Sequence, residues 1–169
     1  MKLSVKILIL ILAVFFITST LFVFSELGGY RKYRYYIEKI CEQKGVEVEL
    51  ALAVARTESS FDESAVSKKG AVGLMQIMPS TAEYIAKKVK FDKELDLYNP
   101  QTNLYLGICY LEYLFNRYGD ERVVLACYNA GEGTVSKWTE EDIKNPPYRE
   151  TKKYIEKVKR RKFIYSIFI

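Results

Sequence analysis

An apolar run near the N-terminus limits what this chain can fold into. Residues 7–24 are apolar apart from a hydroxyl cluster at Thr18–Thr20, and Lys2 and Lys6 precede the run. A run of this length is just long enough to cross a bilayer as a helix, and it is longer than most signal-peptide apolar regions. We therefore expect residues 1–29 to form an uncleaved membrane anchor with a short linker.

Cleavage and orientation of this segment leave alternatives. No Ala-x-Ala site follows the run, but Val23 and Ser25 form a poor cleavage site, so secretion after removal of a signal peptide is the second interpretation. Three cations beyond the run oppose the positive-inside bias of the lysines before it: Arg31, Lys32 and Arg34. If the run is a signal-anchor, the protein is a single-pass membrane protein with its C-terminal domain outside the cytoplasm.

Residues 30–169 show helical periodicity and no strand-like alternation of useful length. Helix start and stop signals predict one helix over 30–43, ended by Gly45, and a second that opens at Glu47 or Glu49 and carries Glu58. The later helices are predicted over Ser80–Val89 with a Ser80–Glu83 capping box, Asn99–Tyr118, Asp120–Asn129 and Arg149–Lys162, followed by an apolar tail at 163–169. We expect a single all-α domain behind an N-terminal transmembrane helix.

Composition excludes several kinds of chemistry. The 169 residues include no histidine, which removes Ser-His-Asp catalysis and histidine-based zinc sites, and no phosphate-binding glycine loop is present. Glutamate and aspartate are the main acid–base groups left. The net charge of +5 suits an anionic surface such as a membrane or a cell-wall polymer and is too diffuse to indicate nucleic acid.

The three cysteines have no metal-binding spacing. Cys109 and Cys127 lie among apolar residues, so buried thiols are expected, with a disulfide between these two as the alternative. We expect no metal site and no cofactor.

Glu58 follows an almost wholly apolar helical stretch. Leu50, Val54 and Glu58 are spaced by four, so the glutamate continues an apolar ridge. Loss of water and the negative end of its own helix both raise the pKa of a carboxyl group placed there. Such a group can hold a proton near neutral pH and act as a general acid. The alternative is a helix-terminal glutamate that turns outward to solvent.

Several predicted helices end or begin at polar, glycine-bearing junctions, as expected if element ends line a cleft. These junctions are Glu58-Ser59, Gly73-Leu74-Met75-Gln76 and Tyr128-Asn129. Each has a plain alternative: the glycines shape turns, Met75 fills the core and Asn129 terminates a helix.

Together these segments resemble the lytic transglycosylases with a goose-lysozyme-like catalytic domain, the glycoside hydrolase family 23 type. The motifs that carry the resemblance are Glu58-Ser59, Gly73-Leu74-Met75-Gln76, Ala126-Cys127-Tyr128-Asn129-Ala130-Gly131 and Glu150-Thr151-Lys152-Lys153-Tyr154. Residues 78–82 and 99–107 also fit, and the resemblance covers roughly 46–158. Cys127 departs from the alanine that the family usually has before the tyrosine.

The resemblance implies a lysozyme-like helical domain that cleaves the β-1,4 bond between N-acetylmuramic acid and N-acetylglucosamine in peptidoglycan. These enzymes leave a 1,6-anhydromuramyl end without using water. A single glutamate, Glu58 here, would act first as acid and then as base. The resemblance further implies that the sugar is held by Ser59, Met75, Gln76, Tyr128, Asn129 and Tyr154, although Tyr154 could equally be a core aromatic on the last helix.

Two other functions remain open. A muramidase of the same fold would hydrolyse the bond with water, using Asp62 or Glu63 as the second carboxylate. A catalytically silent wall-binding module within an envelope assembly is the third hypothesis. The expected partners are peptidoglycan strands, the membrane through the N-terminal helix, and other envelope proteins, with no nucleic acid.

The last predicted helix is strongly basic. Its cations could face anionic lipid or a teichoic-type polymer, although a solvated helix face is the preferred interpretation. They are Lys152, Lys153, Lys157, Lys159, Arg160, Arg161 and Lys162.

Overall fold

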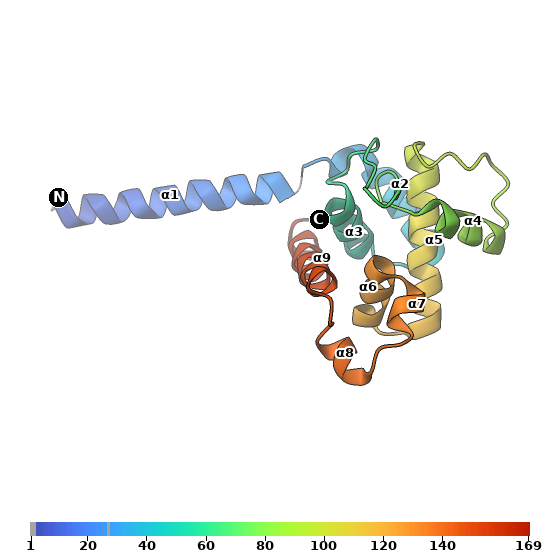
Figure 1. Cartoon of the computed structure of the whole chain (residues 1–169). Coiled ribbons are helices and arrows are strands. Elements are labelled where there is room, and N and C mark those ends of the chain that lie inside the picture. The colour runs from blue at the N-terminus through green and yellow to red at the C-terminus, as the bar shows by residue number, and fades with distance from the viewer. Residues whose placement is uncertain (1–2, 27) are drawn as a thin grey trace.

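The structure is a computed structural model that describes residues 3–26 and 28–169 (Figure 1). Lys2 of the predicted anchor and Leu27 of the predicted linker lie outside the described residues. Over the described ranges the chain forms nine helices and no strand, so the predicted all-α class is confirmed. The helices are α1 (Leu3–Glu26), α2 (Tyr30–Lys44), α3 (Val48–Glu58), α4 (Pro79–Lys88), α5 (Pro100–Tyr118), α6 (Glu121–Ala130), α7 (Glu132–Val135), α8 (Glu140–Lys144) and α9 (Arg149–Phe168).

Helix α1 projects away from the remaining helices (Figure 1). Its segment Val5–Ser25 has a mean hydropathy of 2.9 and is long and apolar enough to cross a membrane. The helix runs through Glu26 and α2 begins at Tyr30, so few residues of the chain separate the two helices. A guanidinium nitrogen of Arg56 donates to the backbone oxygen of Ser25 at 2.6 Å, which ties the end of α1 to the domain.

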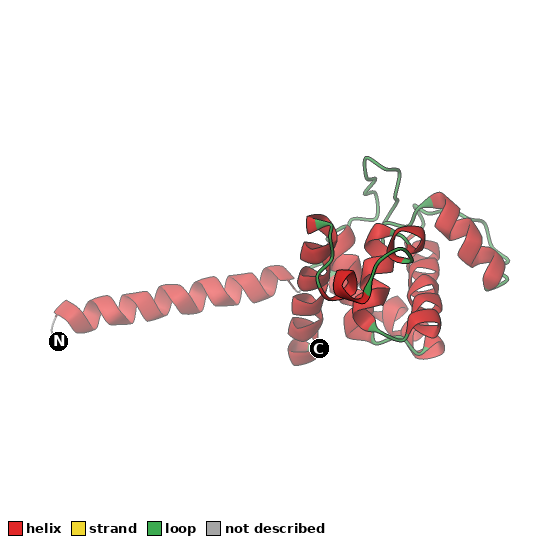
Figure 2. Cartoon of the chain, turned by 60° about the horizontal axis from the view of Figure 1, so that its bottom comes forward, coloured by secondary structure: helices red, strands yellow, loops and turns green. Residues whose placement is uncertain are grey.

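Helix α3 lies at the centre of the domain. Its residues 50–55 are all buried, and the helix packs against α2 and α9. Helix α5 packs against α2, α4 and α6, and α6 in turn contacts α9. Helices and connecting loops account for all of the described fold in Figure 2. Because α3 is enclosed by other helices, its last residue, Glu58, lies where the helix leaves the core and is partly buried.

Two predicted helix starts are confirmed by side-chain caps. The carboxamide oxygen of Asn99 accepts from the backbone nitrogens of Gln101 and Thr102, with Pro100 at the first helical position. The carboxylate of Asp120 caps α6 in the same way.

Two predicted boundaries are wrong. Helix α4 begins at Pro79 and has no side-chain cap, so the Ser80–Glu83 capping box does not form, because Ser80 already lies inside the first turn. Helix α9 continues past Lys162 to Phe168. Its continuation is supported by Tyr165, which is buried with its ring centroid 6.2 Å from that of Tyr30.

The long loop between α3 and α4 is pinned to α5 by one buried side chain. The Oδ1 atom of Asn103 accepts from the backbone nitrogen of Met75 at 2.8 Å. Its Nδ2 atom donates to the carbonyl oxygens of Val72 and Leu97 at 2.8 and 2.9 Å. One turn further on, a side chain at Gly107 would collide with that of Met75, so glycine is required for this close approach. The loop is therefore fixed at its Gly-Leu-Met-Gln segment.

We expect Asn103→Ala to lower the free energy of unfolding by about 2 to 4 kcal/mol, because it leaves buried backbone groups without partners. Urea unfolding of the full chain in detergent would measure this loss. The matched control is Asn99→Ala, which removes an exposed helix cap and should cost about 1 kcal/mol. Equal losses in the two variants would show that Asn103 does not hold the loop.

Candidate active site

Glu58 is partly buried at the C-terminal end of α3 rather than turned out to solvent. Burial raises its pKa from 4.5 to about 7. The Tyr154 hydroxyl and then the Lys157 cation act in the opposite direction and lower the pKa, whereas the charge of Glu150 raises it. Desolvation dominates, so this carboxyl group is divided between its protonated and ionised forms near neutral pH.

Two tyrosines from different helices lie close to Glu58. Tyr154, on the inner side of α9, is buried, and its hydroxyl has no hydrogen bond of standard geometry to any described residue. Its effect on the pKa of Glu58 nevertheless shows that it lies next to the carboxyl group. The Tyr128 hydroxyl, on α6, donates to the backbone oxygen of Met75 at 2.9 Å. Burial, followed by the charge of Glu58, raises the pKa of both phenols well above the usual value, so both remain neutral donors.

Ser59 and Gln76 shape the loop beside Glu58. The Ser59 hydroxyl donates to the carbonyl oxygen of Leu74 at 2.8 Å and so joins the end of α3 to the loop. Gln76 has a left-handed backbone with φ 46°, and its amide nitrogen donates to the carbonyls of Ala65 and Gly73, both at 3.0 Å. The amide hydrogens of Gln76 are therefore used within the loop.

Met75 has no exposed side-chain surface in this arrangement. The side chain is fully buried, whereas its backbone nitrogen and oxygen bind Asn103 and Tyr128. The structure thus places Met75 as a core residue whose backbone joins the loop between α3 and α4 to Asn103 of α5 and to Tyr128 of α6.

Asn129 lies at the end of α6 and lines a pocket of about 500 Å³. Glu150, whose charge raises the pKa of Glu58, lines the same pocket, whereas Glu58 itself is not one of its lining residues. The other lining residues are Lys69, Ala130, Thr134, Pro147, Tyr148, Arg149 and Thr151. The pocket therefore offers an amide and charged groups of both signs to a polar ligand.

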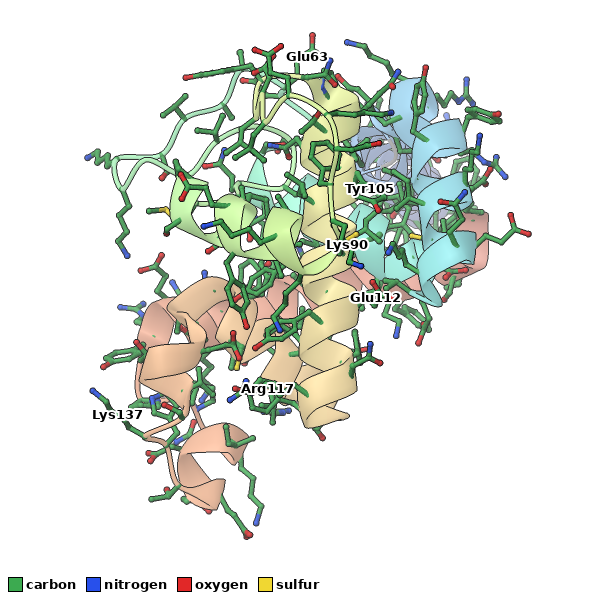
Figure 3. All side chains as sticks on the ribbon, turned by 90° about the vertical axis from the view of Figure 1, so that its right-hand side faces the viewer. Glu63, Lys90, Tyr105, Glu112, Arg117 and Lys137 are labelled. Atoms are coloured by element: carbon green, nitrogen blue, oxygen red, sulfur yellow. The ribbon has the colours of Figure 1, made fainter. Side chains whose placement is uncertain are left out.

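A second pocket, of about 580 Å³, lies between α2, α5 and the segment that follows α4. Lys90 and Tyr105 line it and are labelled in Figure 3. Although this pocket is larger, none of the described residues predicted for the site lines it, and we do not assign the chemistry there.

The other acids near Glu58 in sequence are engaged elsewhere. Asp62 is exposed and accepts from the backbone nitrogen and hydroxyl of Ser64 at 2.9 and 2.7 Å. Glu63 accepts from the Tyr33 hydroxyl at 2.6 Å and pairs with Lys32 at 2.9 Å. These hydrogen bonds lower the pKa of both carboxyl groups. Figure 3 shows Glu63 at the rim of the domain.

The three cysteines, all within the described part of the chain, are buried free thiols, so the alternative Cys109–Cys127 disulfide is wrong. In the same part of the chain, histidine, cysteine, aspartate and glutamate residues form no group of three that could hold a metal ion.

Three residues that affect the site are present in the sequence motifs or in the basic run, but the sequence alone assigned them no role in the site. Asn103 holds the loop, and Glu150 and Lys157 act on the pKa of Glu58. The positions of the last two gave a usable signal, because Glu150, Tyr154 and Lys157 are spaced by four and three along α9 and so share one side of it.

The chain is similar in sequence to several known proteins. The family profile described as "Transglycosylase SLT domain" matches residues 35–150. The soluble lytic murein transglycosylase of Escherichia coli K12 is 34% identical over 128 residues, covering 68% of this chain and 20% of that protein. Membrane-bound lytic murein transglycosylase C of Haemophilus influenzae (strain PittGG) is 34% identical over 142 residues, covering 77% of this chain and 40% of that protein.

Solved structures agree with the sequence comparison. The crystal structure of the 70 kDa soluble lytic transglycosylase of Escherichia coli matches with a TM-score of 0.74 and 32% identity, over 80% of this chain and 24% of that one. The structure of an inactive mutant of the lytic transglycosylase Slt from Pseudomonas aeruginosa matches with a TM-score of 0.72 and 30% identity, over 79% of this chain and 24% of that one. The chain thus spans less than half the length of these relatives. Its helical domain has the predicted lysozyme-like fold, and the chain belongs to the transglycosylase SLT domain family.

Proposed function

We propose that this protein is a membrane-anchored lytic transglycosylase that cleaves the β-1,4 bond between N-acetylmuramic acid and N-acetylglucosamine of peptidoglycan. The observation that carries the proposal is Glu58, a single carboxyl group with a pKa raised to about 7 by burial, in a chain of the transglycosylase SLT domain family. The relatives with this domain are named lytic murein transglycosylases.

The reaction requires one group that first gives and then takes a proton. Protonated Glu58 donates its proton to the glycosidic oxygen as the bond from that oxygen to C1 of the muramyl sugar breaks. The substrate's own N-acetyl carbonyl stabilises the positive charge at C1. The resulting carboxylate then accepts the proton of the C6 hydroxyl while the C6 oxygen bonds to C1. Glu58 ends protonated, and the product carries a 1,6-anhydro ring. A pKa near 7 suits both halves of this cycle.

Tyr154 stabilises the ionised half of the cycle. Its hydroxyl lies beside Glu58 and lowers the pKa of that carboxyl group, so it favours the carboxylate that forms after the first proton transfer. We assign sugar contact to Asn129, which lines the pocket that also contains Glu150. Ser59, Gln76 and Met75 hold the loop against which the substrate lies, and Tyr128 fixes that loop to α6.

The arrangement favours transglycosylation over hydrolysis. A hydrolytic muramidase would need a second carboxylate aimed at the same bond. Asp62 and Glu63 are instead bound to Ser64, Tyr33 and Lys32, and only Glu150 acts electrostatically on Glu58 among the described acids.

The anchor places the domain near its substrate. We propose that residues 1–29 hold the chain in the membrane through α1 and that residues 30–169 are the catalytic domain, outside the cytoplasm. The apolar length of α1 supports the anchor, and peptidoglycan lies on that side of the membrane. Other envelope proteins are further candidate partners.

We expect Glu58→Gln to lower the rate of peptidoglycan cleavage by about 10²- to 10⁴-fold, since general acid–base catalysis contributes on this order. Release of soluble fragments from purified sacculi would measure the loss. Asp62→Asn and Glu63→Gln are the controls and should cleave at close to the wild-type rate. If the Glu58→Gln protein cleaves at the wild-type rate, Glu58 is not the general acid.

We expect the Glu58→Gln protein to remain folded. Because the pKa of Glu58 in the folded state lies above 4.5, the wild type loses stability as pH rises towards about 7 and the buried carboxyl group ionises. The variant escapes this loss. At pH 8 it should therefore unfold with a free energy about 1 to 3 kcal/mol higher than the wild type.

We expect the cleavage rate to fall as pH rises, with a midpoint near the Glu58 pKa of about 7, since the acid must start protonated. Tyr154→Phe removes a group that lowers this pKa, so it should shift the midpoint to higher pH. Tyr35→Phe, at an exposed site on α2, is the control and should leave the profile unchanged. An unshifted midpoint in Tyr154→Phe would show that Tyr154 does not lower the pKa of Glu58.

Mass spectrometry of the digested wall distinguishes the remaining functions. We expect muramyl products lighter by one water than the reducing sugars, as the intramolecular reaction requires. Reducing ends would establish a hydrolase instead, and sacculus binding with no released fragment would establish a wall-binding module.

A further inference from the structure

Helix α9 lies on the side of the domain from which α1 departs. Figures 1 and 2 show α9 beside the base of α1, with its axis running across the direction of α1. If α1 crosses a bilayer, as the proposed function holds and as this inference assumes, α9 lies roughly along the plane of that bilayer.

The two sides of α9 differ in character. The inner side is buried against the domain through Tyr154, Ile155, Val158 and Tyr165. The outward side is charged over its first turns and apolar at its end. Its exposed residues include Lys153, Glu156, Lys159, Arg160, Phe163, Ile167 and Phe168, so cations outnumber the single acid in this set.

The apolar end of this outward side leaves large side chains uncovered. Phe163 is 66% exposed, Ile167 58% and Phe168 50%. Water-exposed side chains of this size at consecutive turns of one helix are unfavourable unless something apolar covers them.

The surface of α1 continues this apolar patch. Phe168 and one side of α1 together line an apolar groove of about 320 Å³, to which α1 contributes Phe16, Ser19, Thr20, Val23 and Phe24. These α1 residues belong to the predicted membrane span. The end of α9 is therefore at the depth of the span, while Lys159 and Arg160 lie two to three turns before it.

We infer that the outward side of α9 binds the surface of an anionic bilayer next to α1, as a second membrane contact of the domain. The lysines and arginine would meet lipid phosphates, and Phe163, Ile167 and Phe168 would enter the boundary with the acyl chains. The apolar residues favour lipid over a polyanionic wall polymer, which would engage the cations alone. Because α1 already tethers the domain, even a weak contact is strengthened by the high local concentration.

This contact would set the height of the active site above the membrane. Tyr154 lies on the inner side of the same helix and acts on Glu58. The catalytic carboxyl group would thus be held about one helix diameter, ~10 Å, from the lipid surface.

Fluorescence quenching by brominated lipids tests the inference on the full chain. Trp138, the only tryptophan, is replaced by phenylalanine, and a new tryptophan is introduced singly by Phe168→Trp, Phe16→Trp or Tyr98→Trp. Phe16 reports on the span, and Tyr98 is a matched exposed aromatic, 57% accessible, in the loop before α5. The proteins are reconstituted in vesicles of brominated phosphatidylcholine with or without phosphatidylglycerol.

With phosphatidylglycerol present, we expect Phe168→Trp to lose at least about half as much emission as Phe16→Trp, and Tyr98→Trp to lose almost none. Quenching at Phe16→Trp with none at Phe168→Trp would overturn the second contact and leave the anchor standing. No quenching at either position would overturn the anchor and this inference together. Equal quenching of Phe168→Trp without phosphatidylglycerol would overturn the role given to anionic lipid.

Discussion

The proposed reaction depends on the burial of one carboxyl group at the end of a buried helix. Helix α3 is enclosed by α2 and α9, and Glu58 is its last residue. Desolvation raises the pKa of Glu58 to about 7 against the opposing effects of Tyr154 and Lys157. The same packing that stabilises the domain therefore keeps this carboxyl group partly protonated near neutral pH, as the proposed general acid requires. No second carboxylate is needed in the proposed reaction, which fits the local hydrogen bonds that occupy Asp62 and Glu63.

The site also depends on a loop with no regular secondary structure. Residues between α3 and α4 are held through the buried Asn103 side chain, the Ser59 hydroxyl and the Tyr128 hydroxyl, which come from three different helices or their ends. Each contact satisfies a backbone group that would otherwise be buried without a partner. These three contacts join the loop to the end of α3, to α5 and to α6, and so fix the Gly-Leu-Met-Gln segment beside Glu58.

Local sequence signals predicted the helices well and the division of roles within the site less well. Asn99-Pro100 and Asp120 mark helix starts because capping is a local interaction. The predicted cap at Ser80 was wrong because the helix already begins at Pro79. Helix α9 is longer than predicted because Tyr165 packs on Tyr30, which is far away in sequence. The motifs located Glu58 and its neighbours. The motifs did not reveal that the side-chain amide of Gln76 donates its hydrogen bonds within the loop, or that the Met75 side chain is buried. Both facts arise from tertiary contacts.

The central claim is that Glu58 keeps its proton near neutral pH, and a direct titration of that side chain tests it. Carbon-13 NMR of protein labelled at the glutamate carboxyl carbon, with Glu58→Gln used to assign the signal, would follow ionisation of this one group. We expect a midpoint near 7. A midpoint at the ordinary glutamate value of 4.5 would contradict it, because the carboxyl group would then be ionised before it met its substrate.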